Sequence, residues 1–535
     1  MRTTIRTTAG RTTDTRAAAG ARSAALALLA ALAPSVAAAL PPTETPDIEL
    51  YLSGATAQDE VLENLLRLNA GIEGAPNICE PGTLDIYRGR IAGTNKRLYF
   101  CRTSDRIPGV AAGRRLAIHK SSGGSGEGVG PVAAREPVAY LDLRALPAAA
   151  SCREGVDARA VGDLAAYREH RGCDGAGKLV VPREGLSDVE PRLFGAVTAP
   201  LHSRSQNQIV WGLPVTKNLR NALQAVQGLV AASVPHDEPQ RDIEGAMPTL
   251  TRTQVAGIFA GKLESWSQFY DDRGVGMPLS RHLAAAPAAN PDAGGATPGA
   301  YRPAPELGDE IFVCRRIASS GTQASYEVHY LRNRCVAGVT PFVAPNDGSD
   351  VNTGGDVRAL VRTANPQGHV FAGVGTSDVV QCLDAHEEFN RWAVGMMSTE
   401  TKGNNGNAEF RYIKVDGYAP TLLNAHHGRW SHISEQSIQW LESFEPSLTS
   451  SDEGRVLSFV ATNLGLPRAL RGLNTGFVHP WGQGGYLAPL TSGFLPPRPP
   501  VTAEALRGNP VTGVSKSLNG LNNCEEPVML NASGF

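Results

Sequence analysis

The sequence predicts an α/β fold with mostly parallel sheets, divided between two or more lobes. Apolar, strand-like runs repeatedly enter a short Gly/Ser loop and then a segment with apolar residues at helical spacing. Such strand–loop–helix units favour parallel sheets, with functional sites at the carboxyl ends of the strands. The chain has 535 residues, which is too long for one ordinary hydrophobic core.

The predicted elements follow one another along most of the chain. They are a strand at 48–52, a helix at 58–68, a strand at 116–118, a loop at 120–126, helices at 219–230 and 250–259 (the latter capped by Thr251), a strand from 311, alternating elements to about 418 and a helix at 435–444. Residues 284–305 are mainly Ala, Pro and Gly, which predicts a mobile surface loop. From 474 onward the chain is Gly/Pro-rich with little periodicity, which predicts an irregular tail.

Composition indicates a folded globular protein without a bulk charge signal. Hydrophobic residues make up 41% and charged residues 19% of the chain, and the net charge is −2. This balance argues against a nucleic-acid partner or an anionic membrane surface, so any anion site must be local. We expect a monomer.

The N-terminus has the layout of a secretory signal peptide. Arginines between 2 and 22 precede an apolar run at 24–33, and three alanines at 37–39 offer a small-residue cleavage site before Leu40. The alternative is a membrane anchor, but the apolar run is too short to span a bilayer comfortably. We therefore expect a mature chain in the periplasm or outside the cell.

Eight cysteines fit an oxidising compartment. Short loop length favours pairing Cys79 with Cys101, Cys152 with Cys173 and Cys314 with Cys335, which leaves Cys382 and Cys524. None of them has the C-x-x-C spacing of a zinc or thioredoxin-like site, and we expect no metal.

The segment 313–322 carries the strongest functional signal. A strand-like run ends in Arg315 and Arg316, and a Ser-Gly-Thr triplet follows before a helical pattern at 323–328. Free backbone N–H groups at a helix start, hydroxyl groups and a guanidinium together suit a tetrahedral oxyanion. Taken alone, the two arginines would more often be a surface pair at a strand end, and the spacing of the Ser-Gly-Thr triplet reverses this preference.

Catalytic patterns are missing from the sequence. No G-x-S-x-G nucleophile elbow, G-x-G-x-x-G dinucleotide loop or P-loop occurs in it. Adjacent His426 and His427 in a loop favour solvation over metal binding. We therefore expect a binding protein that has neither enzymatic activity nor a cofactor.

Several segments, taken in order, resemble the type 2 periplasmic solute-binding proteins, and most closely the phosphate-binding component of bacterial ABC transporters. The segments are Ser-Gly-Ala-Thr at 53–56, Ser-Ser-Gly-Gly at 121–124, Gly-Leu-Ser-Asp at 185–188, the helix at 250–266, Arg316 with Ser-Gly-Thr at 320–322, and the strand and hairpin residues at 393–398 and 415–417. The resemblance implies two α/β lobes, hinge strands and a ligand cleft between the lobes. It also implies phosphate as the ligand and an inner-membrane ABC permease as the partner.

The resemblance carries individual residues into the site. They are Thr56, Ala57, Ser121, Ser122, Asp188, Arg316, Ser320, Gly321 and Thr322. Asp188 would accept a proton from the ligand, which favours hydrogen phosphate over sulfate. As the alternative, Asp188 could be an ordinary turn or N-cap residue.

Three departures from the family pattern leave the ligand and the transport role open. Ala57 stands where an aromatic residue is common, Ala318 stands where an acidic residue is common, and the insertions and tail are long. Two alternatives follow: a secreted or surface protein that uses this scaffold for adhesion or another ligand, and an exported phosphatase-like hydrolase. The expected segments are a signal peptide at 1–39, a first lobe at 40–215 with a disulfide-closed insertion near 152–173, a second lobe at 216–390 with the loop at 284–305, a return to the first lobe and hinge at 391–473, and the tail at 474–535.

Overall fold

The structure is a computed structural model. All described residues belong to one compact unit, which spans Ala39–Phe535. The described residues are 44–68, 76–142, 144, 152, 156–158, 160, 164–174, 177–195, 199–231, 233–269, 310–336, 357, 361, 369–388, 391–402, 409–490, 494–517 and 520–530. The signal peptide predicted at 1–39 and the loop predicted at 284–305 lie outside these residues. No helix in the described ranges is long and apolar enough to cross a membrane.

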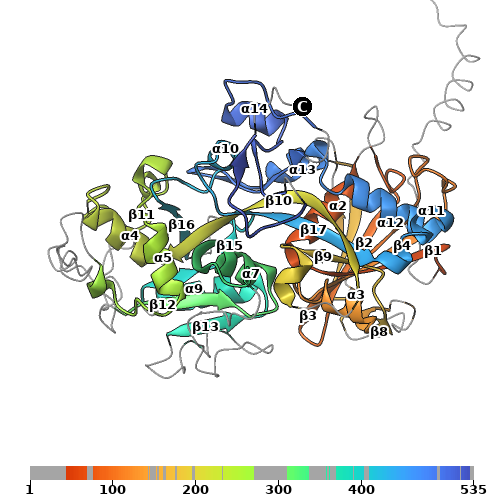
Figure 1. Cartoon of the computed structure of the whole chain (residues 1–535), viewed down its shortest axis with the longest axis horizontal. Helices are drawn as coiled ribbons and strands as arrows, with labels where there is room; N and C mark the ends of the chain where they lie inside the picture. Colours follow the sequence, from red (N-terminus) through yellow and green to blue (C-terminus); the bar gives the residue numbers. More distant parts are fainter. Residues whose placement is uncertain are drawn as a thin grey trace, which may run out of the picture. The chain divides into compact units, whose positions relative to one another are not determined.

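One large mixed sheet organises the described part of the chain (Figure 1). In spatial order its main path contains β13 (Val370–Gly373), β12 (Phe312–Arg316), β14 (Ala393–Gly395), β10 (Leu201–Thr216), β17 (Ile433–Leu441), β9 (Glu184–Ser187), β1 (Ile48–Gly54), β4 (Arg115–Ser122), β3 (Thr94–Arg102), β2 (Asp85–Ile91), β7 (Tyr167–Arg171) and β6 (Val156–Ala158). Four further strands pair at its side, namely β11 (Thr249–Leu250), β15 (Met397–Ser398), β16 (Phe410–Val415) and β20 (Tyr486–Leu487). Because strands alternate with helices along the chain, the predicted α/β class is confirmed.

Parallel pairs lie at the centre of each half of the sheet. Strand β1 is parallel to β4 and β9, and β12 is parallel to β13 and β14. The two halves are joined by the antiparallel pair of β10 and β17, the two long strands drawn between the halves in Figure 1. Ser437 of β17 also pairs with Ser187 of β9, so the long strands are continuous with the first half of the sheet.

Helices cover both halves of the sheet. They are α2 (Asp59–Arg67), α3 (Gly130–Ala134), α4 (Lys217–Val226), α5 (Arg252–Phe259), α7 (Gly321–Tyr326) with the π-turn η7 (Glu327–Leu331), α9 (Thr376–Glu388), α10 (Leu422–His426), α11 (Ser447–Ser450), α12 (Asp452–Asn463), α13 (Pro467–Asn474) and α14 (Ala503–Gly508). Helices α12 and α13 pack against α2, and α9 packs against β12. The predicted cap of α5 is confirmed: Thr251 Oγ1 accepts a hydrogen bond from Gln254 N, and the Gln254 side chain returns one to Thr251 N.

Short elements complete the described part. They are η2 (Thr56–Gln58), β5 (Val138–Leu141), β8 (Gly177–Val180), η3 (Pro191–Phe194), η4 (Pro239–Arg241), η5 (Glu244–Ala246), η6 (Trp266–Gln268), η8 (Glu442–Phe444), β18 (Val478–His479), β19 (Gly482–Gln483), β21 (Val514–Ser515) and β22 (Val528–Met529). The residues after 474 contribute to the main core, where Tyr486, Leu487 and Val511 are fully buried.

The helix predicted at 435–444 is wrong, because this segment forms β17 and the turn η8. Residues from Ile433 to Trp440 are buried on both faces of the sheet. Strand pairing with β10 and β9 supplies the backbone hydrogen bonds. The polar side chains between the apolar ones find partners in neighbouring loops, as Gln436 does, so tertiary contacts override the local helical pattern.

The disulfides confirm two predicted pairs and correct the others. Cys79–Cys101 and Cys152–Cys173 form as predicted, with separations of 22 and 21 residues. The predicted Cys314–Cys335 pair is wrong: Cys314 bonds Cys382 and Cys335 bonds Cys524.

Packing decides these two bonds. Cys314 lies on β12, against which α9 brings Cys382. Extending the loop from 21 residues to the 68 of Cys314–Cys382 costs only about 1 kcal/mol of closure entropy. Such a small local preference for the nearer cysteine is easily outweighed by tertiary packing.

Candidate functional site

The loops that the sequence singles out meet at the junction of the two halves of the sheet. The loop after β4 touches the loop before α7, where Gly126 N donates a hydrogen bond to Ser319 O at 2.9 Å. Gly321, the first residue of α7, lies against Asp188 of the segment after β9. A Cβ at this glycine would come within 2.6 Å of Asp188 Oδ2, so close approach requires glycine here.

Asp188 is buried at this junction and held by two side chains. Its Oδ1 accepts a hydrogen bond from Gln436 Nε2 at 2.7 Å, and its Oδ2 accepts one from Ser125 Oγ at 3.2 Å. Burial raises the pKa of Asp188, while these hydrogen bonds and the charge of Arg316 act in the opposite direction. The carboxyl group is therefore held in a fixed orientation at the junction.

Arg316 faces the same region from the end of β12 and is buried. Its guanidinium donates to Gly373 O at 3.3 Å, Val374 O at 2.5 Å and Thr376 Oγ1 at 3.2 Å. Among the described residues no carboxylate oxygen lies within 4.0 Å of it. Burial lowers its pKa to about 10, so the group still carries its charge at neutral pH.

The surroundings of Arg316 add to the positive potential. The N-terminus of α9 begins at Thr376, whose hydroxyl contacts the guanidinium, and Ser320 immediately precedes α7. Thr322 Oγ1 lies 3.5 Å from Arg316 Nη1. Helix N-termini carry partial positive charge, so this side of the junction favours an anion.

The remaining predicted residues form a neighbouring cluster in the first half. Thr56 Oγ1 donates to Ser122 O at 3.3 Å, and Ser122 Oγ donates to Asp59 Oδ2 at 2.7 Å. Ser121 Oγ bonds Lys96 and Glu127.

Ala57 contributes its backbone to this cluster. Its carbonyl oxygen accepts a hydrogen bond from Tyr486 Oη at 2.6 Å. Within the described part of the chain, none of the hydrogen bonds of Thr56, Ser121 or Ser122 reaches Arg316. The structure thus brings Asp188, Arg316 and Gly321 together. The hydroxyl groups of Thr56, Ser121 and Ser122 belong to an adjoining hydrogen-bond network.

The sequence analysis did not predict three residues of this region. Ser125 lies inside the Ser/Gly loop and could have been included on that basis. Gln436 had no signal, because only the pairing of β17 with β9 places it beside Asp188. Lys120, near the end of β4, is fully buried and links this strand to the segment between β1 and α2. Its Nζ lies 3.3 Å from Asp59 Oδ1 and donates a hydrogen bond to Gly54 O at 3.0 Å.

Comparison with known proteins gives solved structures of phosphate-transport proteins. One from Clostridium perfringens, assigned to the phosphate ABC transporter substrate-binding class and holding phosphate, is 11% identical, with 79% of this chain and 97% of that chain covered and a TM-score of 0.36. An ABC-type phosphate transport receptor from Vibrio cholerae is 16% identical, with 56% and 80% covered and a TM-score of 0.29. PstS from Borrelia burgdorferi is 9% identical, with 80% and 97% covered and a TM-score of 0.31. No family model and no curated protein sequence matches the chain.

Proposed function

We propose that this protein binds a small tetrahedral oxyanion, with phosphate as the favoured ligand, at the junction of Arg316 and Asp188. The observation that carries the proposal is the buried guanidinium of Arg316, which keeps its charge and has no carboxylate within ion-pair distance among the described residues. A buried charge is costly unless it is paired. Asp188 and Asp378 attract this guanidinium only from beyond ion-pair distance, so an anion that enters beside Arg316 would add a direct counter-charge.

Asp188 gives this site a way to select among oxyanions. A carboxylate repels a fully deprotonated dianion but forms a short charge-assisted bond with a ligand that donates a proton. Hydrogen phosphate has such a proton at neutral pH, whereas sulfate does not. A site that combines the charge of Arg316 with the carboxyl group of Asp188 therefore favours phosphate.

Ligand capture would close the two halves of the sheet on each other. Asp188 and Ser125 belong to the first half and Arg316 to the second, while β10 and β17 join them. A ligand that bridges the two halves stabilises the closed arrangement over an open one. In this proposal the exported protein delivers the anion to an inner-membrane ABC permease, which recognises the closed form.

Isothermal titration calorimetry tests the site. The chain from Leu40 onward, stripped of bound anion, is titrated with phosphate and with sulfate. We expect saturable phosphate binding and no sulfate binding, and we expect Arg316→Ala to weaken phosphate binding by about 10- to 150-fold through loss of a charge-assisted contact.

The matched control is Arg507→Ala. Arg507 lies on α14 in an exposed pair with Glu504, away from the junction, and its loss should leave phosphate affinity unchanged. Equal phosphate affinity in Arg316→Ala and wild type would overturn the site. Absence of heat with phosphate in the wild type would overturn the ligand.

A further inference from the structure

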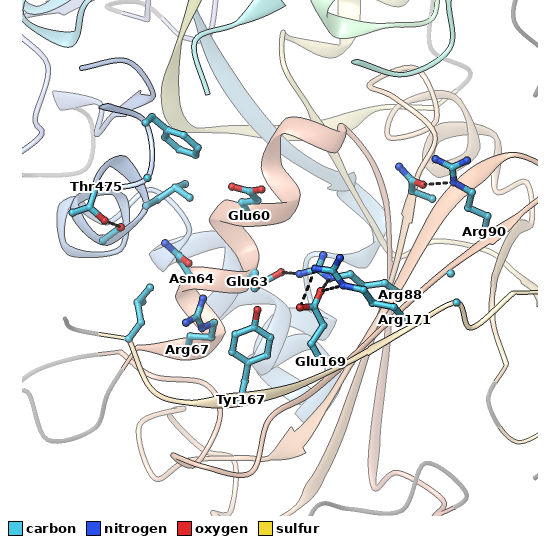
Figure 2. Close-up of a pocket in the computed structure, with 18 of the residues that line it drawn as sticks. Glu60, Glu63, Asn64, Arg67, Arg88, Arg90, Tyr167, Glu169, Arg171 and Thr475 are labelled. Carbon is cyan, nitrogen blue, oxygen red and sulfur yellow. Dashed lines mark hydrogen bonds and ion pairs between the residues drawn. The ribbon is translucent and has the colours of Figure 1, made fainter. Parts of the chain in front are cut away.

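A second open groove lies along α2. It has a volume of about 1010 Å³ and is bounded by α2, by β7 and by α13 with the chain that follows it (Figure 2). Its walls combine charged side chains with the apolar surfaces of Leu473 and Phe477. The proposed anion site uses none of the residues that line this groove.

Half of the charged side chains that line the groove already neutralise one another. Arg88 lies 2.6 Å from Glu63 and 2.6 Å from Glu169, and Arg171 lies 3.0 Å from Glu169 (Figure 2). These four side chains form an ion-pair network, which Arg97 extends by lying 3.3 Å from Glu63. They therefore leave little charge for a ligand.

Three polar groups on α2 are different. Glu60, Asn64 and Arg67 are spaced by four and then three residues, which places them along one face of the helix (Figure 2). In the described part of the chain, the side chains of all three make no hydrogen bond or ion pair with the protein. They present a carboxylate, an amide and a guanidinium to the groove, in that order.

Arg67 is held in position by stacking. Its guanidinium carbon lies 4.3 Å from the centroid of the Tyr167 ring, and its Nε is buried without a hydrogen-bond partner. Stacking covers one face of the guanidinium and Nε is buried, so the edge formed by the two Nη groups is the one left for a ligand. Such an edge is suited to bidentate binding of a carboxylate.

We propose that this groove binds a short peptide in its zwitterionic form, with the ammonium group at Glu60 and the carboxylate at Arg67. The amide of Asn64 offers one donor side and one acceptor side, which matches a peptide group between the two ends. Seven residues of α-helix rise about 10 Å, and an extended chain covers about 3.3–3.6 Å per residue. A tripeptide therefore spans the distance, and its side chains can contact Leu473 and Phe477.

Calorimetry with capped peptides tests the charge pattern. The purified chain is titrated with the tripeptide Ala-Leu-Ala, with its N-acetyl form and with its C-terminal amide. We expect saturable binding of the free tripeptide, and about tenfold or greater weakening with either cap, because each cap removes one charge-assisted contact. Absence of saturation by the free tripeptide up to 5 mM, or equal binding of the capped forms, would overturn the proposal.

Variants on α2 assign the contacts. Glu60→Gln should weaken binding of the free tripeptide about tenfold and leave the affinity of the N-acetyl form unchanged. Arg67→Gln should likewise weaken binding of the free tripeptide about tenfold and leave the affinity of the C-terminal amide unchanged. Arg171→Gln is the control, because this residue lines the same groove but its charge is paired with Glu169. Equal losses in Arg171→Gln and Arg67→Gln would refute the assignment. We expect each variant to retain the fold, because the changed side chains line the groove. Circular dichroism and thermal unfolding of each variant check this.

Discussion

Glu184 allows a prediction about stability that can be worked through in numbers. It lies on β9 between Leu52 of β1 and Trp440 of β17, is fully buried, and neither of its carboxylate oxygens has a hydrogen-bond partner. Burial raises its pKa to about 8, and the charge of Glu453 acts in the same direction. The protonated form is therefore the form that the folded protein favours.

The sign of the pH effect follows from the raised pKa. In the unfolded chain this carboxyl ionises near its ordinary value of 4.5, so below that pH the folded protein has no penalty from it. As the pH rises from there toward 8, the unfolded state loses its proton while the folded state keeps it. Each pH unit in this window lowers the free energy of unfolding by about 1.4 kcal/mol. Between pH 5 and pH 8 the loss is about 3.5 kcal/mol, since the slope is shallower close to each pKa. This is a large share of a typical total of about 5–15 kcal/mol.

The substitution Glu184→Gln keeps the shape and removes the ionisation. We expect wild type and variant to have similar urea midpoints at pH 5, and the variant to be more stable by about 3.5 kcal/mol at pH 8. The measurement is urea unfolding at both values with the disulfides intact. As a control, Glu453→Gln removes the neighbouring charge and should give a smaller gain at pH 8. Identical pH dependence in wild type and Glu184→Gln would refute the reasoning.

Three further predictions concern the junction and the disulfides. Gly321→Ala should weaken phosphate binding at least tenfold in calorimetry, because the new Cβ would lie 2.6 Å from a carboxylate oxygen of Asp188, whereas Gly245→Ala, with open space around it, should have no effect. Asp188→Asn should raise sulfate affinity relative to phosphate, and an unchanged ratio of the two dissociation constants would contradict the selection argument. Replacing Cys335 and Cys524 together by Ser should lower the free energy of unfolding by about 2–5 kcal/mol in urea titrations, and a change below 1 kcal/mol would indicate that this cross-link is dispensable.

Local physics explains what could be read from the sequence. Hydrophobic periodicity and loop residues predict β1, α2, β4 and α5 where the structure has them, because each depends on neighbours within a few turns of chain. The two short disulfides, at 79–101 and 152–173, follow from loop length in the same way. Arg316 could also be named as a candidate from its Ser-Gly-Thr loop, whereas Asp188 became a candidate through the family resemblance.

Only the tertiary structure decided the long-range features. The sheet converts the helical pattern at 435–444 into β17 and thereby places Gln436 on Asp188. Packing of α9 on β12 selects Cys382 for Cys314 over a nearer cysteine. The groove is formed by α2 (Asp59–Arg67), β7 (Tyr167–Arg171) and α13 (Pro467–Asn474), which are far apart in the sequence. Sequence thus determined the elements and the candidate anion motifs. The tertiary structure decided which elements and side chains contact one another. The difference in loop-closure entropy between near and distant contacts is small compared with the free energy gained by packing, so burial and strand pairing select the partners.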